Sequence, residues 1–107
     1  MKKNILITGT STGVGFESAI LFAEAGFQVY ASMRNLKKAD ALKAKITEAA
    51  LDIEILQLDV TDNASIEKAV NAIIAKDGKL DKLLNNAGAG FEKTLEQASQ
   101  AGLDWVT

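Results

Sequence analysis

The segment ILITGTSTGVG, which runs from Ile5 to Gly15, decides how this chain folds. Its continuous apolar start predicts a strand over residues 4–8 that is buried on both faces, as in a parallel sheet. A helical pattern of apolar residues then begins at Val14 and continues to Ala25. A strand, a glycine-rich turn and a helix in this order form an arrangement that can bind the pyrophosphate of a dinucleotide.

The glycines of this turn are spaced G-x-x-x-G-x-G, at Gly9, Gly13 and Gly15. The spacing differs from the G-x-G-x-x-G of many dehydrogenases, and no Gly-Lys-Ser/Thr follows that would make it a P-loop. Backbone amides in such a turn approach phosphate oxygens, and the helix N-terminus adds about half a positive charge. Further donors in the turn are the hydroxyls of Thr10, Ser11 and Thr12. Taken alone, the pattern also fits an ordinary turn between a strand and a helix.

Composition limits the class of protein. The chain has 107 residues, 48% hydrophobic and 24% charged, so it forms one globular domain at most. Its net charge of −2 gives no basic field to attract nucleic acid or an anionic membrane, and no segment approaches the roughly 18 apolar residues of a membrane span. The absence of cysteine and histidine excludes disulfides, thiolate chemistry and histidine general bases. We expect a cytoplasmic protein without nucleic-acid or membrane partners.

Strands and helices alternate along the rest of the chain. Further strands are predicted over residues 27–33, 53–58 and 82–85, and a further helix over about residues 36–50. A third helix is capped by Asp62 or Asn63 and ends near Asp77-Gly78, and a weaker helical pattern covers residues 95–102. The inward-facing stripe of the second helix is predicted to run from Leu36 to Ala49, and that of the third from Ile66 to Ile74. This alternation predicts an α/β fold with a parallel sheet, whose ligands bind at the carboxyl ends of the strands.

Arg34 lies at the end of the second predicted strand, about 20 residues beyond the glycines, where dinucleotide folds contact the adenosine ribose. An acid at this place would bind the 2′-hydroxyl of NAD, whereas an arginine favours the 2′-phosphate of NADP. None of Ser32, Met33 and Arg34 is acidic, which favours NADP over NAD. The alternative is that Arg34 is a solvated surface residue.

Two more polar motifs end predicted strands. Asp59 and Val60 follow the third strand, where they could contact an adenine ring, or where Asp59 could simply form a turn before a helix. Asn85-Asn86-Ala87-Gly88 ends the fourth strand, where small residues allow a ligand to lie close to the backbone. The side-chain amides of Asn85 and Asn86 can bridge neighbouring loops, although the motif also fits a polar turn.

These three motifs, in this order and spacing, resemble the short-chain dehydrogenase/reductase family, and the resemblance covers essentially the whole chain. It implies a Rossmann-like, doubly wound parallel sheet with four strands in the order 3-2-1-4 and three to four helices. It also implies a nicotinamide cofactor, NADP rather than NAD, and hydride transfer between a small-molecule carbonyl compound and its alcohol.

The resemblance also implies a role for each motif residue. Those that hold the diphosphate and the adenosine side of the cofactor are Gly9, Ser11, Gly13, Val14 and Gly15. Those that lie along the nicotinamide ribose are Asn86, Ala87 and Gly88. Arg34 marks NADP preference, Asp59 and Val60 contact adenine, and Asn85 mainly ties strands together.

The sequence departs from the family where catalysis should occur. Longer family members add an Asn, a Ser and a Tyr-x-x-x-Lys motif, whereas the one tyrosine here is Tyr30, within the second predicted strand. We therefore expect residues 1–107 to be a single cofactor-binding fragment that is inactive alone. The alternative is a complete, non-catalytic nucleotide-binding or interaction module. A methyltransferase is disfavoured because no acid follows the second strand.

A fragment of this kind would leave the outer side of its fourth strand without a neighbouring strand. We expect an open apolar edge there, with Trp105 and Val106 lacking the layer against which they would pack. Open strand edges pair with other chains. The sequence therefore predicts self-association or marginal stability.

Overall fold

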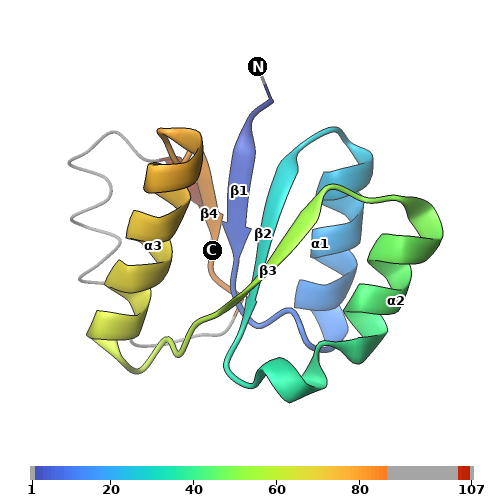
Figure 1. Cartoon of the computed structure of the whole chain (residues 1–107), viewed down its shortest axis with the longest axis horizontal. Helices are drawn as coiled ribbons and strands as arrows, with labels where there is room; N and C mark the ends of the chain where they lie inside the picture. Colours follow the sequence, from blue (N-terminus) through green and yellow to red (C-terminus); the bar gives the residue numbers. More distant parts are fainter. Residues whose placement is uncertain (1, 87–103, 107) are drawn as a thin grey trace.

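A parallel sheet lies at the centre of the chain, with helices on both of its faces (Figure 1). The structure is a computed structural model that describes residues 2–86 and 104–106. Within these residues the strands are β1 (Asn4–Ile7), β2 (Gln28–Met33), β3 (Ile53–Gln57), β4 (Lys82–Leu84) and β5 (Asp104–Val106). The helices are α1 (Gly13–Glu24), the 3-10 helix η1 (Leu36–Lys38), α2 (Asp40–Ala49) and α3 (Asn63–Asp77).

The strand order is β3-β2-β1-β4-β5, and every neighbouring pair is parallel. The predicted order 3-2-1-4 and the Rossmann-like class are therefore confirmed. In the register, Leu6 of β1 lies between Tyr30 of β2 and Leu83 of β4. Because all strands run the same way, the loops that follow β1, β2, β3 and β4 lie together at the carboxyl end of the sheet.

The sheet has one strand more than predicted. β5 pairs with the outer side of β4, with Leu83 opposite Trp105. The expectation of an open edge at β4 was therefore wrong. The self-association was predicted from that open edge, so this reason for it no longer applies. The helix expected over residues 95–102, and the motif residues Ala87 and Gly88, lie outside the described residues.

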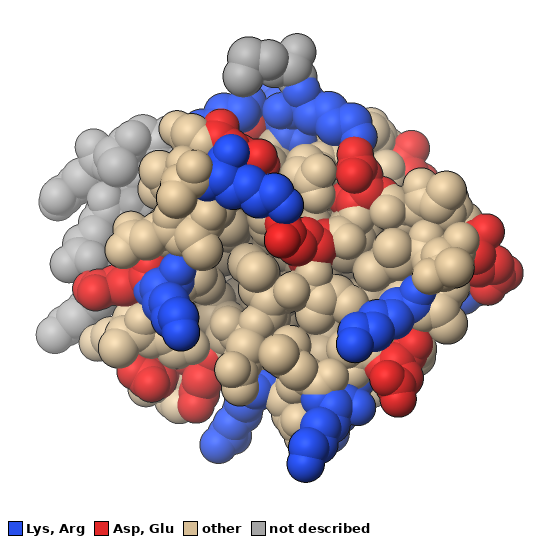
Figure 2. Space-filling view, in the orientation of Figure 1, with Lys and Arg blue, Asp and Glu red and all other residues tan. Residues whose placement is uncertain are grey.

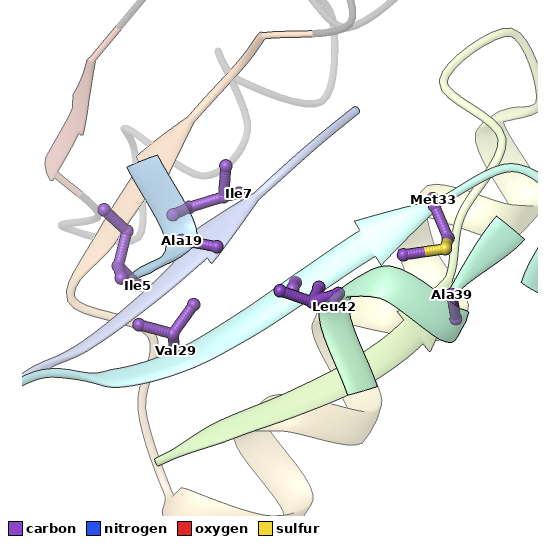
Figure 3. Close-up of a cluster of buried hydrophobic side chains, with 8 residues drawn as sticks. Ile5, Ile7, Ala19, Val29, Met33, Ala39 and Leu42 are labelled. Atoms are coloured by element: carbon purple, nitrogen blue, oxygen red, sulfur yellow. The ribbon is translucent and has the colours of Figure 1, made fainter. Parts of the chain in front are cut away.

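The two faces of the sheet have separate apolar cores, because successive strand residues point to opposite sides. The cluster on the α3 side consists of Leu6, Tyr30, Leu58, Ile66, Ala69, Ile73 and Leu83. The cluster on the side of α1 and α2 consists of Ile5, Ile7, Ala19, Val29, Ala31, Met33, Ala39 and Leu42 (Figure 3). Burial on both faces explains the continuous apolar run at the start of the sequence.

The second and third helices differ from the prediction at their margins. The side chain of Asn35 accepts a hydrogen bond from the backbone N–H of Lys37 and starts the 3-10 turn η1, so that α2 begins only at Asp40. Leu36 is consequently 44% exposed instead of lying on a buried stripe, and Ala49 is also exposed. Ile74 is 44% exposed because adjacent helical positions lie about 100° apart and Ile73 takes the buried one.

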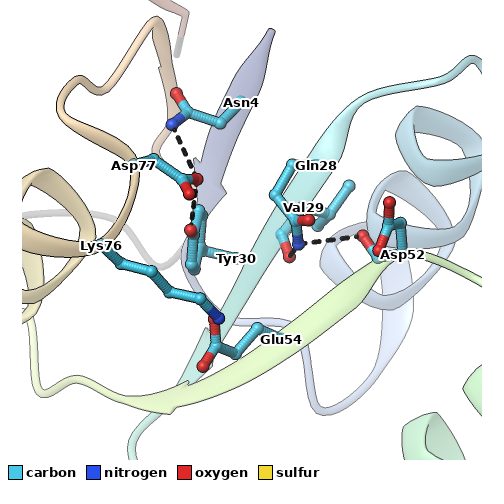
Figure 4. Close-up of polar contacts among 8 residues, drawn as sticks. All are labelled: Asn4, Gln28, Val29, Tyr30, Asp52, Glu54, Lys76 and Asp77. Carbon is cyan, nitrogen blue, oxygen red and sulfur yellow. Dashed lines mark hydrogen bonds and ion pairs between the residues drawn. The ribbon is translucent and has the colours of Figure 1, made fainter. Parts of the chain in front are cut away.

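A polar network joins the amino end of the sheet to the end of α3 (Figure 4). The buried phenol of Tyr30 donates to the carboxylate of Asp77, which also accepts from Asn4 Nδ2 at 3.3 Å. Asn4 and Asp81 form a reciprocal pair, with Asn4 N 2.9 Å from Asp81 Oδ2 and Asp81 N 2.7 Å from Asn4 Oδ1. The network fixes β1, β2 and α3 relative to one another at the end opposite the glycine turn.

Candidate functional site

The glycine-rich turn is anchored to the strands on both sides of β1. The backbone N–H of Thr8 donates to the carbonyl of Leu84 at 3.1 Å. On the other side, the backbone N–H and the hydroxyl of Thr10 both donate to the carbonyl of Ser32, at 3.1 and 2.9 Å. The hydroxyl of Ser32 donates in turn to the carbonyl of Ile7 at 2.9 Å. The hydroxyl of Thr10 is thus used inside the protein, where it shapes the turn.

Two glycines of the turn have backbone angles that side chains disfavour, and the third has no room for a side chain. Gly9 and Gly13 have φ values of +67° and +65°, which glycine adopts at no steric cost. A Cβ on Gly15 would lie 2.0 Å from the carbonyl oxygen of Gly9 and 2.8 Å from Asn86 Nδ2. The spacing of the three glycines therefore lets α1 start directly against the turn.

The amino end of α1 is open to an anion. Thr12 precedes the helix in an extended conformation and makes no side-chain capping hydrogen bond. The first turn contains no acidic residue, and Val14 within it is 71% exposed. The first N–H groups of a helix have no partner within the helix and carry the positive end of its dipole. This end of α1 can therefore bind a phosphate oxygen.

The end of β4 is joined to the turn through Thr8 and two asparagines. The hydroxyl of Thr8 donates to Asn85 Oδ1 at 3.0 Å and accepts from the backbone N–H of Asn86 at 2.9 Å. Asn86 Nδ2 donates to the carbonyl of Gly9 at 3.1 Å. Asn85 ties two strands together, as predicted. Asn86 positions the first glycine of the turn, so its side-chain amide bridges neighbouring loops as predicted.

Arg34 and Asp59 form an ion pair between the loops that follow β2 and β3. Arg34 Nε lies 3.7 Å from Asp59 Oδ2, with the two side chains 81% and 31% exposed. The other carboxylate oxygen of Asp59 accepts from Thr61 Oγ1 at 2.6 Å and from the backbone N–H of Thr61 at 2.9 Å. These hydrogen bonds, with a smaller contribution from Arg34, lower the pKa of Asp59 below its ordinary value. Asp59 is therefore ionised at neutral pH.

Basic side chains surround this corner of the molecule. Arg34, Lys37 and Lys38 are all exposed, and Figure 2 shows basic side chains projecting from the edge where β2 ends and η1 begins in Figure 1. Val60, predicted to contact adenine, is half-buried and packs against the apolar cluster on the α3 side. It borders the site as part of that core.

The hydrogen bonds made by Thr8, Ser32 and Thr61 were not predicted from the sequence. Thr8 and Ser32 lie at strand ends, and their roles depend on contacts with other strands. Thr61 had a local signal, because an aspartate commonly accepts a hydrogen bond from the residue two positions later. Among the described residues, no group of three or more acidic, histidine or cysteine side chains could hold a metal ion. No helix that the structure describes has the length and hydropathy to cross a membrane.

Residues 3–106 match the family model of the short chain dehydrogenases. The chain therefore belongs to the short-chain dehydrogenase/reductase family, a family of oxidoreductases that use nicotinamide cofactors.

Relatives with assigned activities are similar over most of this chain. A 3-ketodihydrosphingosine reductase of Bacteroides thetaiotaomicron is 38% identical over 96 residues, which cover 90% of this chain and 32% of the relative. Human retinol dehydrogenase 8 is 36% identical over 108 residues, covering 97% and 34%. The crystal structure of an actinorhodin polyketide ketoreductase variant with NADPH superimposes with a TM-score of 0.75 at 29% identity, covering 81% of this chain and 33% of that one. The chain thus spans about a third of the length of these proteins.

The site fits the nicotinamide cofactor that the family implies. Gly15 packs α1 closely against the carbonyl of Gly9, the amino end of α1 is uncapped, and a guanidinium lies at the end of β2. The first two features suit the diphosphate, and the third suits a phosphate on the adenosine ribose.

Proposed function

We propose that this chain binds the cofactor of an NADP-dependent oxidoreductase that transfers hydride between a small-molecule carbonyl compound and its alcohol. The close approach of Gly15 to the carbonyl oxygen of Gly9 carries the proposal, because it brings the uncapped end of α1 directly against the turn. When bound, the cofactor supplies the hydride. The residues that would hold its diphosphate are Gly9, Ser11, Gly13, Val14 and Gly15.

Three features support NADP over NAD. The side chain of Met33 is buried and apolar, so the residue that ends β2 supplies no carboxylate to accept from a 2′-hydroxyl. Arg34 projects into solvent next to this position. Lys37 and Lys38 add positive charge in the following turn, and positive charge attracts the dianionic 2′-phosphate. The relative that was solved with NADPH supports the same choice.

We further propose that the chain binds the cofactor without turning it over. Proton transfer to a carbonyl needs an acid within hydrogen-bond reach of the substrate. The phenol of Tyr30 is buried and donates to Asp77 at the amino end of the sheet, whereas the glycine turn lies at the carboxyl end. Burial, together with the Asp77 carboxylate, raises the pKa of Tyr30 far above its ordinary value. Tyr30 is thus misplaced and too weak an acid for this reaction.

Isothermal titration calorimetry with NADPH and NADH tests the proposal. We expect both to bind and NADPH to bind more tightly. With a panel of aldehydes and ketones, NADPH oxidation should not exceed that of a control without protein. If neither nucleotide binds, or if both bind equally, the proposed cofactor is wrong. Oxidation above the control would show that the chain holds a proton donor other than Tyr30.

A further inference from the structure

The carboxylate of Asp59 has two sets of partners on its two oxygens. Oδ1 accepts both hydrogen bonds from Thr61, at 2.6 Å from the hydroxyl and 2.9 Å from the backbone N–H. Oδ2 lies 3.7 Å from Arg34 Nε. Thr61, Asp59 and Arg34 therefore form a chain of contacts that runs from the loop after β3 to the end of β2.

The loop that carries Asp59 is itself held in place. The backbone N–H of Asp59 donates to Ser65 Oγ at 3.0 Å, and its carbonyl accepts from the backbone N–H of Asp62 at 3.0 Å. Asp62 caps α3 by accepting from Ala64 N at 3.0 Å. With one oxygen bound twice by Thr61, the Asp59 carboxylate has a defined orientation before any ligand arrives.

A fixed partner such as Asp59 restricts the conformations of the exposed Arg34 side chain before a ligand binds. Its side chain is 81% exposed, and a long exposed side chain loses conformational freedom when it binds a ligand. The contact with Asp59 involves Nε, whereas four of the five N–H donors of a guanidinium are on its two terminal nitrogens. A contact at Nε is thus compatible with bidentate binding of a phosphate by the terminal nitrogens.

We propose that Thr61 and Asp59 are positioning residues that orient Arg34 and thereby increase the preference for a 2′-phosphorylated nucleotide. The inference rests on the proposed function and deepens it, because it assigns part of the cofactor specificity to the loop after β3. Thr61 has no place among the residues expected to touch the cofactor. Its hydroxyl acts on the ligand only through Asp59 and Arg34.

Two nucleotides that differ only in the 2′-phosphate test this inference: adenosine 2′,5′-bisphosphate and adenosine 5′-monophosphate. The measured quantity is the ratio of their dissociation constants for the 107-residue chain. In Thr61→Val the hydroxyl is lost while the shape and the backbone hydrogen bond are kept. We expect the preference for the bisphosphate to fall roughly 3- to 10-fold, less than on deleting a direct charge-assisted hydrogen bond.

Three further variants separate positioning from a general structural effect. Thr61→Ser, which retains the hydroxyl, should restore the wild-type ratio. Thr47→Val makes the same chemical change on the exposed surface of α2 and should leave the ratio unchanged. In an Arg34→Ala background, Thr61→Val should have no further effect on the ratio, because the residue through which it acts is gone.

The outcomes distinguish this inference from the proposed function. If the wild-type chain binds neither nucleotide, the proposed function fails. If it prefers the bisphosphate and Thr61→Val leaves that preference unchanged, the Thr61 hydroxyl does not orient Arg34 and the positioning inference is wrong. If Thr61→Val increases the preference, Asp59 competes with the phosphate for Arg34 and the inference is also wrong. An equal loss of affinity for both nucleotides would also contradict it. Should Thr61→Val not fold, Thr61→Ala, which also removes the hydroxyl at this exposed position, provides the same comparison.

Discussion

The side-chain amide of Asn86 donates to the carbonyl oxygen of Gly9 at 3.1 Å. The same carbonyl oxygen leaves no room for a side chain on Gly15. The turn after β1 is therefore held by a residue from the end of β4 and by the first turn of α1. Because a phosphate would bind at this turn, small changes on any of the three elements should alter nucleotide affinity.

Gly15→Ala should damage both stability and binding. Its Cβ would lie 2.0 Å from the carbonyl oxygen of Gly9, and that backbone atom cannot move without displacing the turn. We expect a loss of about 1–3 kcal/mol in the free energy of unfolding and at least a roughly 10-fold loss in NADPH affinity. Urea denaturation and calorimetry measure the two effects. Gly26→Ala, at φ +97° with open space around it, should cost stability but leave binding intact.

Asn86→Asp should weaken nucleotide binding. A carboxylate cannot donate to the carbonyl of Gly9, and its negative charge lies next to the expected diphosphate. We expect NADPH affinity to fall roughly 10-fold or more. Asn71→Asp introduces the same charge on the exposed surface of α3 and serves as the control. Equal affinities of the two variants would show that Asn86 does not shape the site.

Arg34→Ala should reduce the preference for NADPH over NADH. The guanidinium is the cation next to the end of β2, and hydrogen bonds from charged groups to phosphate are the strong ones. We expect NADPH affinity to fall roughly 10- to 100-fold, with a much smaller change for NADH. Calorimetry with both nucleotides gives the ratio, and Lys43→Ala on exposed α2 is the control. An unchanged ratio would remove Arg34 from the site.

Tyr30→Phe should destabilise the fold without affecting the site at the other end of the sheet. The variant leaves the Asp77 carboxylate without its phenol donor. We expect a loss of about 1–3 kcal/mol in the free energy of unfolding at pH 7, measured by urea denaturation. NADPH affinity, measured under native conditions, should be unchanged. A variant as stable as the wild type would show that the hydrogen bond between Tyr30 and Asp77 contributes no net stability.

The same pair of residues predicts how stability depends on pH. The phenol of Tyr30 lowers the pKa of Asp77, so its contribution is complete above the unfolded value, near 3.9, and is lost as pH falls through the lower folded pKa. Tyr30 has a raised pKa, so the wild type also loses stability above about pH 10, where the unfolded phenol ionises. Tyr30→Phe should lack this alkaline loss and show a weaker acid dependence. The measurement is the midpoint of urea denaturation for the wild type and Tyr30→Phe between pH 2 and pH 11. If the two midpoints change with pH in parallel, this prediction is wrong.

Local sequence signals predicted β1 to β4, the main helices up to α3 and the glycine turn, although α2 begins later than predicted. The apolar run at Ile5-Leu6-Ile7 and the turn glycines each act through neighbouring residues, so their meaning is visible in a short window. The order of the strands followed from the family resemblance. Arg34 became a candidate for the site because about 20 residues separate it from the glycines.

Contacts between distant segments could not be predicted in the same way. Asn4 pairs with Asp81 across 77 positions, and nothing near either residue indicates the other. β5 was missed because three residues give no periodic signal, and its pairing with β4 depends on the sheet itself. Ile74 was misplaced because an apolar side chain next to the buried Ile73 looks the same in sequence whether it points inward or outward.

The hydrogen bond between Gly9 and Asn86 also has a consequence for synthesis on the ribosome. It joins residues 77 positions apart, and chains emerge amino terminus first at roughly 5–20 residues per second. The turn is therefore made roughly 4–15 s before its partner exists. During that interval the nascent chain can bind the turn to β2 through Thr10 but lacks the hydrogen bond from Asn86. Full nucleotide affinity should consequently arise late in translation, when the end of β4 leaves the exit tunnel.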